Sequence, residues 1–148
     1  MNPYFEQTIL NAEPLDLIRM LYRRAISCVR DAREHLSHQR IAERSVAILR
    51  AYSAIAELLV ALRPEIAPEL SGRLRDLYSY MQQRLLDANM QQADQPLAEV
   101  LGLLITLDEA WAGAAVQLAP IRDAVAETRA RPYPAQGRED TARFAVNA

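Results

Sequence analysis

The sequence predicts an all-α protein, an antiparallel up-down four-helix bundle, and three observations support that prediction. The 148 residues include only 4 Gly and 6% aromatic side chains, a composition unlike that of a β-sandwich or barrel. Hydrophobic residues make up 51% of the chain, enough at this length to bury the core of one domain. Four long stretches repeat apolar residues every three or four positions, which is the period of an amphipathic helix.

The first two helices are expected over residues 14–36 and 39–62. Pro14 suits the first helical position, because the N–H that it lacks would have no partner there. Pro64 and Pro68 end the second pattern, since neither can continue a helical hydrogen-bond ladder. The two apolar stripes comprise Ile18, Leu21, Tyr22, Ala25, Val29, Ala32 and Leu36, and Ile41, Ile48, Tyr52, Ile55, Leu59 and Leu62.

The third and fourth helices are expected over residues 68–90 and 94–119. Asp94 can cap the fourth helix with its carboxylate, and the short connections favour antiparallel neighbours. Their stripes comprise Leu70, Leu74, Leu77, Tyr78, Met81 and Leu85, and Leu97, Leu101, Leu104, Trp111 and Leu118. Residues 14–119 would therefore form the bundle. Residues 120–148 would add a short fifth helix, from Ile121 to Arg131, and a flexible, proline-containing tail.

Residues 1–13 do not fit a plain bundle, because four large apolar side chains precede the first helix. They are Tyr4, Phe5, Ile9 and Leu10. Burying each would contribute about 1.5 kcal/mol or more. This N-terminal strap could pack permanently on the core, or it could lie in a groove that a partner helix can also occupy.

Charge and cysteine content exclude several classes of protein. The net charge of −2 gives no basic field for nucleic acid or anionic lipid. A single Cys rules out an internal disulfide framework and multi-cysteine zinc sites. The first ten residues lack a signal-peptide pattern, and the longest apolar run, Leu58 to Leu62, is too short to span a membrane. We expect a cytosolic protein with no membrane insertion and no bound metal or cofactor.

Catalytic constellations are sparse. His35 and His38 are the only histidines, and neither follows a Glu by three residues, as a ferritin-type metal site requires. Arg30 and His35 have the spacing of a HEPN-type ribonuclease, in which Arg holds phosphate and His acts as acid and base. With 17 basic residues in the chain, that spacing readily arises by chance. The ribonuclease remains an alternative to a binding protein, and we expect no enzyme.

Several apolar residues lie off the main stripes of the second, third and fourth helices. They are Val46, Leu49, Val60, Tyr80, Leu86, Leu103 and Leu107. A bundle helix normally keeps one apolar and one polar face. The surplus indicates a groove for apolar helices of another chain, a wide core filled by the fifth helix, or a structural homodimer without a client.

The sequence resembles the FliS family of flagellar secretion chaperones in three segments. Residues 12–22, Ala-Glu-Pro-Leu-Asp-Leu-Ile-Arg-Met-Leu-Tyr, are similar to the family's entry into its first helix. Residues 77–89, Leu-Tyr-Ser-Tyr-Met-Gln-Gln-Arg-Leu-Leu-Asp-Ala-Asn, are close to its Leu-Tyr-Asp-Tyr-Met pattern. The third segment is Glu99-Val100-x-Gly-Leu103-Leu104, with Trp111 after it. Arg23-Arg24 departs from the family's usual Asp-Gly.

The resemblance implies a cytoplasmic export chaperone, a bundle without catalysis whose apolar grooves receive the C-terminal helices of flagellin and prevent early polymerisation. It also implies an N-terminal segment that yields to the client. We expect a monomer or weak homodimer. Other flagellar regulatory or export proteins are further candidate partners. The residues expected to contact the client are Tyr4, Phe5, Ile9, Leu10, Tyr52, Ile55, Leu59, Tyr80, Leu86, Leu103 and Leu107. Tyr22, Tyr78, Met81, Leu85 and Trp111 are expected in the core.

Overall fold

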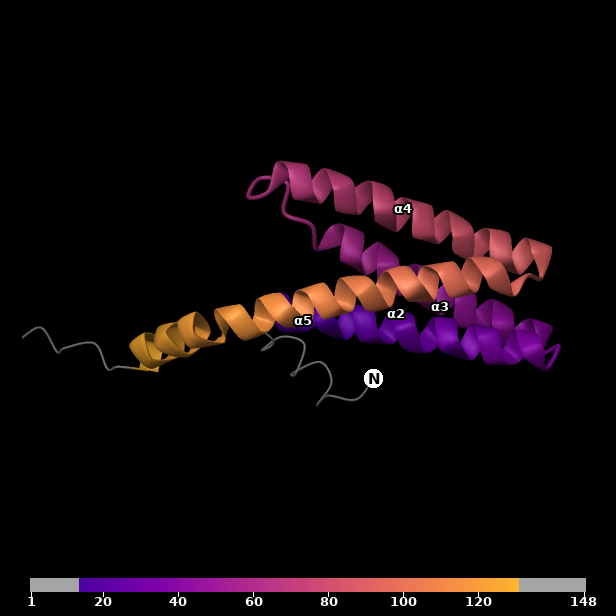
Figure 1. Cartoon of the computed structure of the whole chain (residues 1–148), viewed down its shortest axis with the longest axis horizontal. Coiled ribbons are helices and arrows are strands. Elements are labelled where there is room, and N and C mark those ends of the chain that lie inside the picture. The colour runs from indigo at the N-terminus through magenta and orange to yellow at the C-terminus, as the bar shows by residue number, and fades with distance from the viewer. Residues whose placement is uncertain (1–13, 131–148) are drawn as a thin grey trace, which may run out of the picture. The chain divides into compact units, whose positions relative to one another are not determined.

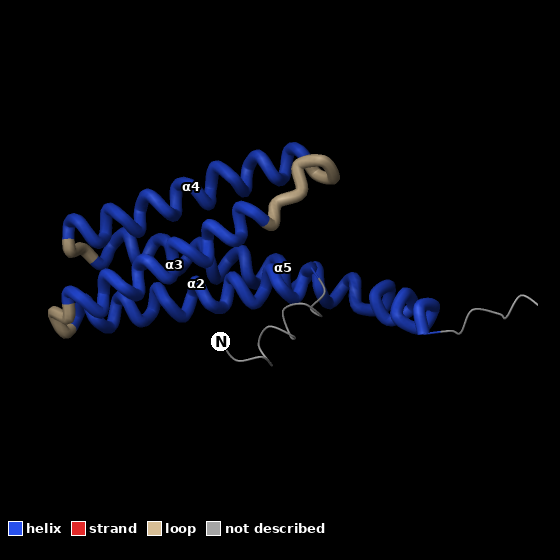
Figure 2. The backbone as a smooth tube through the Cα atoms, turned by 180° about the vertical axis from the view of Figure 1, so that it is seen from behind, coloured by secondary structure: helices blue, strands red, loops and turns tan. Residues whose placement is uncertain are grey.

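The computed structural model describes residues 14–130 and contains four α-helices in that range (Figure 1). They are α2 (Pro14–Ser37), α3 (Ile41–Val60), α4 (Pro68–Gln91) and α5 (Asp94–Ala130). The chain divides into one unit ending at Ala115 and another beginning at Val116. In the first unit, tight connections reverse the chain after α2, α3 and α4 (Figure 2). The predicted all-α four-helix bundle is confirmed.

The helix ends depend on backbone conformation more than on the apolar pattern. Gln39, in the turn after α2, and Gln92, at the end of α4, adopt positive φ values of 57° and 52°. A left-handed residue turns the chain out of a helix and frees it for the next element. For this reason α3 begins at Ile41, two residues later than the pattern predicts. It ends at Val60, two residues before the predicted Leu62, and its C-cap Ala61 keeps a right-handed conformation.

The predicted break at Pro120 is wrong, because α5 runs from Asp94 to Ala130 with Pro120 inside it. A proline in a helix removes one hydrogen bond and crowds the carbonyl four residues earlier, at a cost of about 3 kcal/mol. That cost is local, so a helix can continue on both sides. The expected fifth helix is thus the distal part of α5, and residues 116–130 of the second unit are helical. The tail from residue 131 lies outside the described residues.

The core of the first unit is built on an alanine-lined contact between α2 and α3. These two helices are the most closely packed pair in the described part of the chain. Small side chains let two helix backbones approach closely, and each of the alanines here is at most 6% exposed. They are Ala25 and Ala32 of α2 and Ala47, Ala51 and Ala54 of α3. Larger side chains fill the space toward α4 and α5, among them Leu74, Met81, Leu85, Leu97, Val100 and Leu104.

Two buried tyrosines join α2 to α4 across the core. The Tyr22 and Tyr78 hydroxyls share a hydrogen bond, and the rings meet edge to face with centroids 6.3 Å apart. Their side chains are 0% and 1% exposed. Burial raises the pKa of both hydroxyls above the ordinary tyrosine value, so both stay protonated in the folded protein.

Polar contacts fix the two helix reversals that lie at one end of the bundle. Arg44, which is 3% exposed, donates from Nε to the side-chain oxygen of Asn89 over 3.3 Å, and Ser45 donates to the same oxygen over 3.0 Å. Arg33 binds Asp94 through two hydrogen bonds of 2.8 and 2.9 Å, and this contact lowers the pKa of the Asp94 carboxyl. The start of α3 is thereby tied to the end of α4, and the start of α5 to α2.

Candidate functional site

The half-buried apolar residues between α3 and α4 form the first candidate surface. The side-chain amide of Gln82 in α4 donates to the backbone oxygen of Tyr52 in α3 over 3.3 Å. Ser45 of α3 donates its hydroxyl to Asn89 of α4, and Tyr52 and Leu59 follow Ser45 by two and four turns, so they lie on the side of α3 that faces α4. Leu86 lies one turn after Gln82 and one turn before Asn89, on the facing side of α4. Tyr52, Leu59 and Leu86 are each partly exposed. We call these three residues the α3–α4 surface.

A second surface lies between α4 and α5 and is organised by a polar cluster. The Tyr80 hydroxyl donates to the Glu99 carboxylate, and Arg84 Nε donates to the other Glu99 oxygen over 3.0 Å. The bond from Tyr80, followed by the interaction with Arg84, lowers the pKa of Glu99. Leu103 and Leu107 follow Glu99 by one and two turns and so lie on the same face of α5. We call Tyr80, Leu103 and Leu107 the α4–α5 surface.

The two surfaces lie on opposite sides of α4, because α4 contacts α3 through Gln82 and α5 through Tyr80. Tyr80 is 45% exposed, whereas Leu103 and Leu107 are half-buried. Six of the seven bundle residues that were expected to contact the client are therefore at least partly exposed. The seventh, Ile55, is 0% exposed and belongs to the core, which corrects its expected place in a groove.

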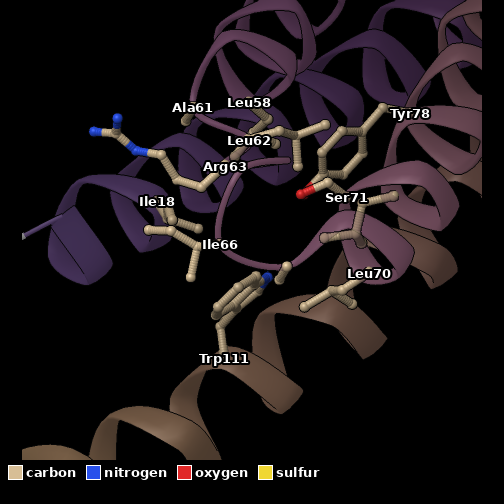
Figure 3. A pocket seen from close by; sticks show the side chains of 12 residues that line it. Ile18, Leu58, Ala61, Leu62, Arg63, Ile66, Leu70, Ser71, Tyr78 and Trp111 are labelled. Atoms are coloured by element: carbon tan, nitrogen blue, oxygen red, sulfur yellow. The ribbon is translucent and has the colours of Figure 1, made fainter.

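An apolar end pocket of about 190 Å³ opens beside the α3–α4 connection (Figure 3). Its lining comes from all four helices and from the α3–α4 connection. The residues are Ile18 of α2, Leu58 of α3, Leu62 and Ile66 of the connection, Leu70 of α4 and Trp111 of α5. Figure 3 shows the indole of Trp111 pointing toward Ile66. Nearly all of the exposed lining is carbon, so the pocket suits an apolar side chain rather than a charged ligand.

The end pocket is the feature that sequence reasoning missed. Trp111 was expected in the core but is half-buried at the pocket. Leu70, placed on the core stripe of its helix, is 52% exposed, and Ile66 in the loop is 77% exposed. The available signal was the isoleucine between Pro64 and Pro68, but single apolar residues are common on protein surfaces and do not by themselves predict a pocket.

The strap residues Tyr4, Phe5, Ile9 and Leu10 lie outside the described residues. The position at which the strap joins the bundle is nevertheless known. The strap leads directly into α2, which begins at Pro14, and Ile18 of the first turns of α2 lines the end pocket.

Within residues 14–130, the two residues of the ribonuclease alternative line different hollows. Arg30 lines a polar hollow between α2 and α5, with Arg23 and Asp108, whereas His35 lines a different hollow between α2 and α3, with Cys28. The ribonuclease pair is thus not brought together. Burial raises the pKa of the Cys28 thiol, which disfavours the reactive thiolate.

Within the described residues we looked for a metal site and for a membrane-spanning helix. Between Pro14 and Ala130, no three His, Cys, Asp or Glu side chains are grouped closely enough to hold a metal ion. None of the four described helices combines the length and the apolarity that a bilayer crossing requires.

Comparison with known proteins gives a consistent result. The family model described as flagellar protein FliS matches residues 1–118. The flagellar secretion chaperone FliS of Salmonella typhimurium is 36% identical over 107 residues, which cover 72% of this chain and 79% of the relative. FliSB of Pseudomonas aeruginosa is 33% identical over 108 residues, covering 73% and 86%. FliS of Bacillus subtilis is 32% identical over 113 residues, covering 74% and 84%.

Proposed function

The chain belongs to the FliS family, and from that premise we propose that it is a cytoplasmic flagellar secretion chaperone that binds the C-terminal helices of flagellin. By covering the apolar faces of these helices, it would prevent flagellin from polymerising before export. The FliS family is a family of chaperones rather than of enzymes.

The observation that carries the proposal is the placement of partly exposed apolar side chains on both sides of α4. A helix of the client laid along the α3–α4 surface would contact Tyr52, Leu59 and Leu86. A second client helix, or the continuation of the first, would contact the α4–α5 surface. Helix-in-groove recognition reads apolar anchors at intervals of three and four residues, and both surfaces offer matching positions.

Polar groups within the α4–α5 surface would orient the client. Glu99 accepts hydrogen bonds from Tyr80 and Arg84 and therefore keeps its charge satisfied inside an otherwise apolar strip. A client side chain that displaced Tyr80 would have to offer Glu99 a donor in return, since an unpaired carboxylate is costly to cover. This requirement favours a client with a donor at one position of its apolar face.

Titration calorimetry with the C-terminal helical peptide of flagellin from the same organism tests the proposal. We expect saturable binding with a negative heat-capacity change, because apolar surface leaves water on both partners. A peptide of the same composition in scrambled order is the control. No detectable binding heat at tens of micromolar flagellin peptide would contradict the proposal.

The strap gives a second prediction, because competition for the client site can be measured. We propose that Tyr4 and Phe5 occupy the same apolar surface as the client, so Tyr4→Ser/Phe5→Ser should tighten flagellin binding by about three- to tenfold. A ligand that must displace a resident segment has its dissociation constant raised by the reciprocal of the fraction of sites that the segment leaves free. Gln7→Ser/Thr8→Ser is the matched control and should leave the affinity unchanged. Weaker binding by the aromatic variant would show that the strap contacts the client instead of competing with it.

A further inference from the structure

The outward face of α3 carries an apolar strip that none of the surfaces above includes. Its members follow one another at spacings of four, three, four, three and four residues. They are Ala42, Val46, Leu49, Ser53, Ala56 and Val60. Val46, Leu49 and Val60 are 48%, 56% and 87% exposed. We call these six residues the outer strip.

The outer strip is unusual because α3 already buries its opposite face. Ile48, Ala51, Ile55 and Leu58 point into the core and are at most 2% exposed. A helix of a bundle normally turns polar residues toward water, and a helix that is apolar all round is normally buried. Alternating spacings of four and three residues are those of the a and d positions of a coiled-coil heptad. The outer strip therefore has the form of a seam for one more helix.

One flank of the outer strip carries charges at heptad intervals. Glu43, Arg50 and Glu57 lie seven residues apart, each directly after a strip residue or one turn beyond it. Glu57 lies 3.9 Å from Arg24. Within residues 14–130, neither Glu43 nor Arg50 is in an ion pair. Flanking charges of this kind select the partner and the register of a coiled coil.

The flanking charges favour some partners of the outer strip over others. One occupant would be the outer strip of a second copy of this chain, paired antiparallel with all six strip residues in register. Arg50 would then face Arg50 of the second copy, and Glu43 would face Glu57. Like charges would therefore oppose each other, which disfavours this pairing. The strap of this chain has no Arg or Lys to place against Glu43, since its only charged side chains are Glu6 and Glu13.

We propose that the outer strip binds an α-helix of another protein that has a heptad-spaced apolar face, a basic side chain against Glu43 and an acidic side chain against Arg50. This second binding surface lies apart from the α4–α5 surface and goes beyond flagellin recognition. An exposed strip of Val, Leu and Ala supplies contact area, and the two flanking charges supply the choice of partner.

Two designed helical peptides with Leu and Ile at a and d test the proposal by titration calorimetry. The first peptide carries a Lys placed to meet Glu43 and a Glu placed to meet Arg50. These charges are repeated on both flanks of its apolar face, so that the peptide can dock in either orientation. In the second peptide the Lys and Glu positions are exchanged. We expect the first peptide to bind about fivefold or more tightly than the second. Glu43→Arg/Arg50→Glu should invert that preference, and Leu49→Lys should remove binding of both peptides.

Controls separate this inference from the proposed function. Leu103→Asp, on the α4–α5 surface, should leave binding of the designed peptide unchanged, and Leu49→Lys should leave binding of the flagellin peptide unchanged. Equal binding of the two designed peptides would overturn the proposal, as would a preference that the charge exchange fails to invert. A dimer that sedimentation detects and Leu49→Lys dissolves would overturn it too, because the strip would then belong to a second copy. Loss of flagellin binding in Leu49→Lys would overturn it by assigning the strip to the client site.

Discussion

Replacement of Leu103 by aspartate is expected to weaken binding of the flagellin C-terminal peptide about a hundredfold or more, while the helical content stays native. Leu103 lies on the α4–α5 surface, four residues after Glu99, and is half-buried in the free protein. A bound client helix would complete its burial, and a carboxylate buried there without a partner costs several kcal/mol. In the free protein the aspartate can still reach water, so folding tolerates it. Calorimetry with the peptide and far-UV circular dichroism measure the two effects.

Thr106→Asp provides the matched control for Leu103→Asp. Thr106 lies on the same helix, is exposed, and donates its hydroxyl to the Gly102 carbonyl over 2.9 Å. Thr106 lies three residues after Leu103 on the same side of α5, so the control places the same charge beside the α4–α5 surface while its apolar side chains stay in place. Equal loss of binding in both variants would mean that charge repulsion, rather than apolar contact, is being measured. Unchanged binding in Leu103→Asp would place the client elsewhere on the bundle.

Removal of the buried tyrosine pair has the second large expected effect, and it acts on stability. Tyr78→Phe leaves the Tyr22 hydroxyl buried without its partner and should lower the free energy of unfolding by about 1–3 kcal/mol. Tyr22→Phe should do the same from the other side. The double variant should lose less than the sum of the two, because no orphaned hydroxyl remains. Urea denaturation of all four proteins completes the cycle, and strict additivity would show that the hydroxyls do not interact.

The same pair makes a distinct prediction at alkaline pH. Burial raises the pKa of both hydroxyls, so the folded state holds their protons where the unfolded chain, with a tyrosine pKa near 10, releases them. The contribution to stability is complete below pH 10 and is lost as the pH rises above it, by up to about 2.7 kcal/mol per pH unit for two protons. The double phenylalanine variant should lack this part of the alkaline loss. An identical pH profile in both proteins would show that the tyrosines ionise equally in the two states.

The sequence predicted the architecture because helix period and proline position are local properties. The patterns in residues 14–36 and 68–90 matched α2 and α4 to within one residue at each end. The start of α3 was less predictable, since the left-handed conformation at Gln39 carries no glycine signal. The continuity of α5 was missed because a proline costs a helix one hydrogen bond but does not forbid it.

The candidate site was harder to predict because it depends on residues that are distant in the chain. Off-stripe apolar residues identified the α4–α5 surface, but the stripe alone could not tell that Ile55 is sealed in the core. The end pocket combines four helices and a loop, and the Tyr22–Tyr78 bond spans 56 positions. Such pairings depend on how helices are rotated about their axes, and a single sequence does not specify that rotation.

The alanine contact between α2 and α3 has a consequence for how this protein can evolve. At Ala25, Ala47 or Ala51 an added methyl group would push two backbones apart, and overpacking of this kind typically costs about 1–3 kcal/mol. Leucines at the α4–α5 surface face no such steric limit on the solvent side, so substitutions there can accumulate. Selection can therefore change the proposed α4–α5 client surface more readily than the buried contact between α2 and α3. With the proposed client site, a lineage could adapt to a changed client by substitutions on the exposed sides of α4 and α5 while the packing of α2 against α3 stays as it is.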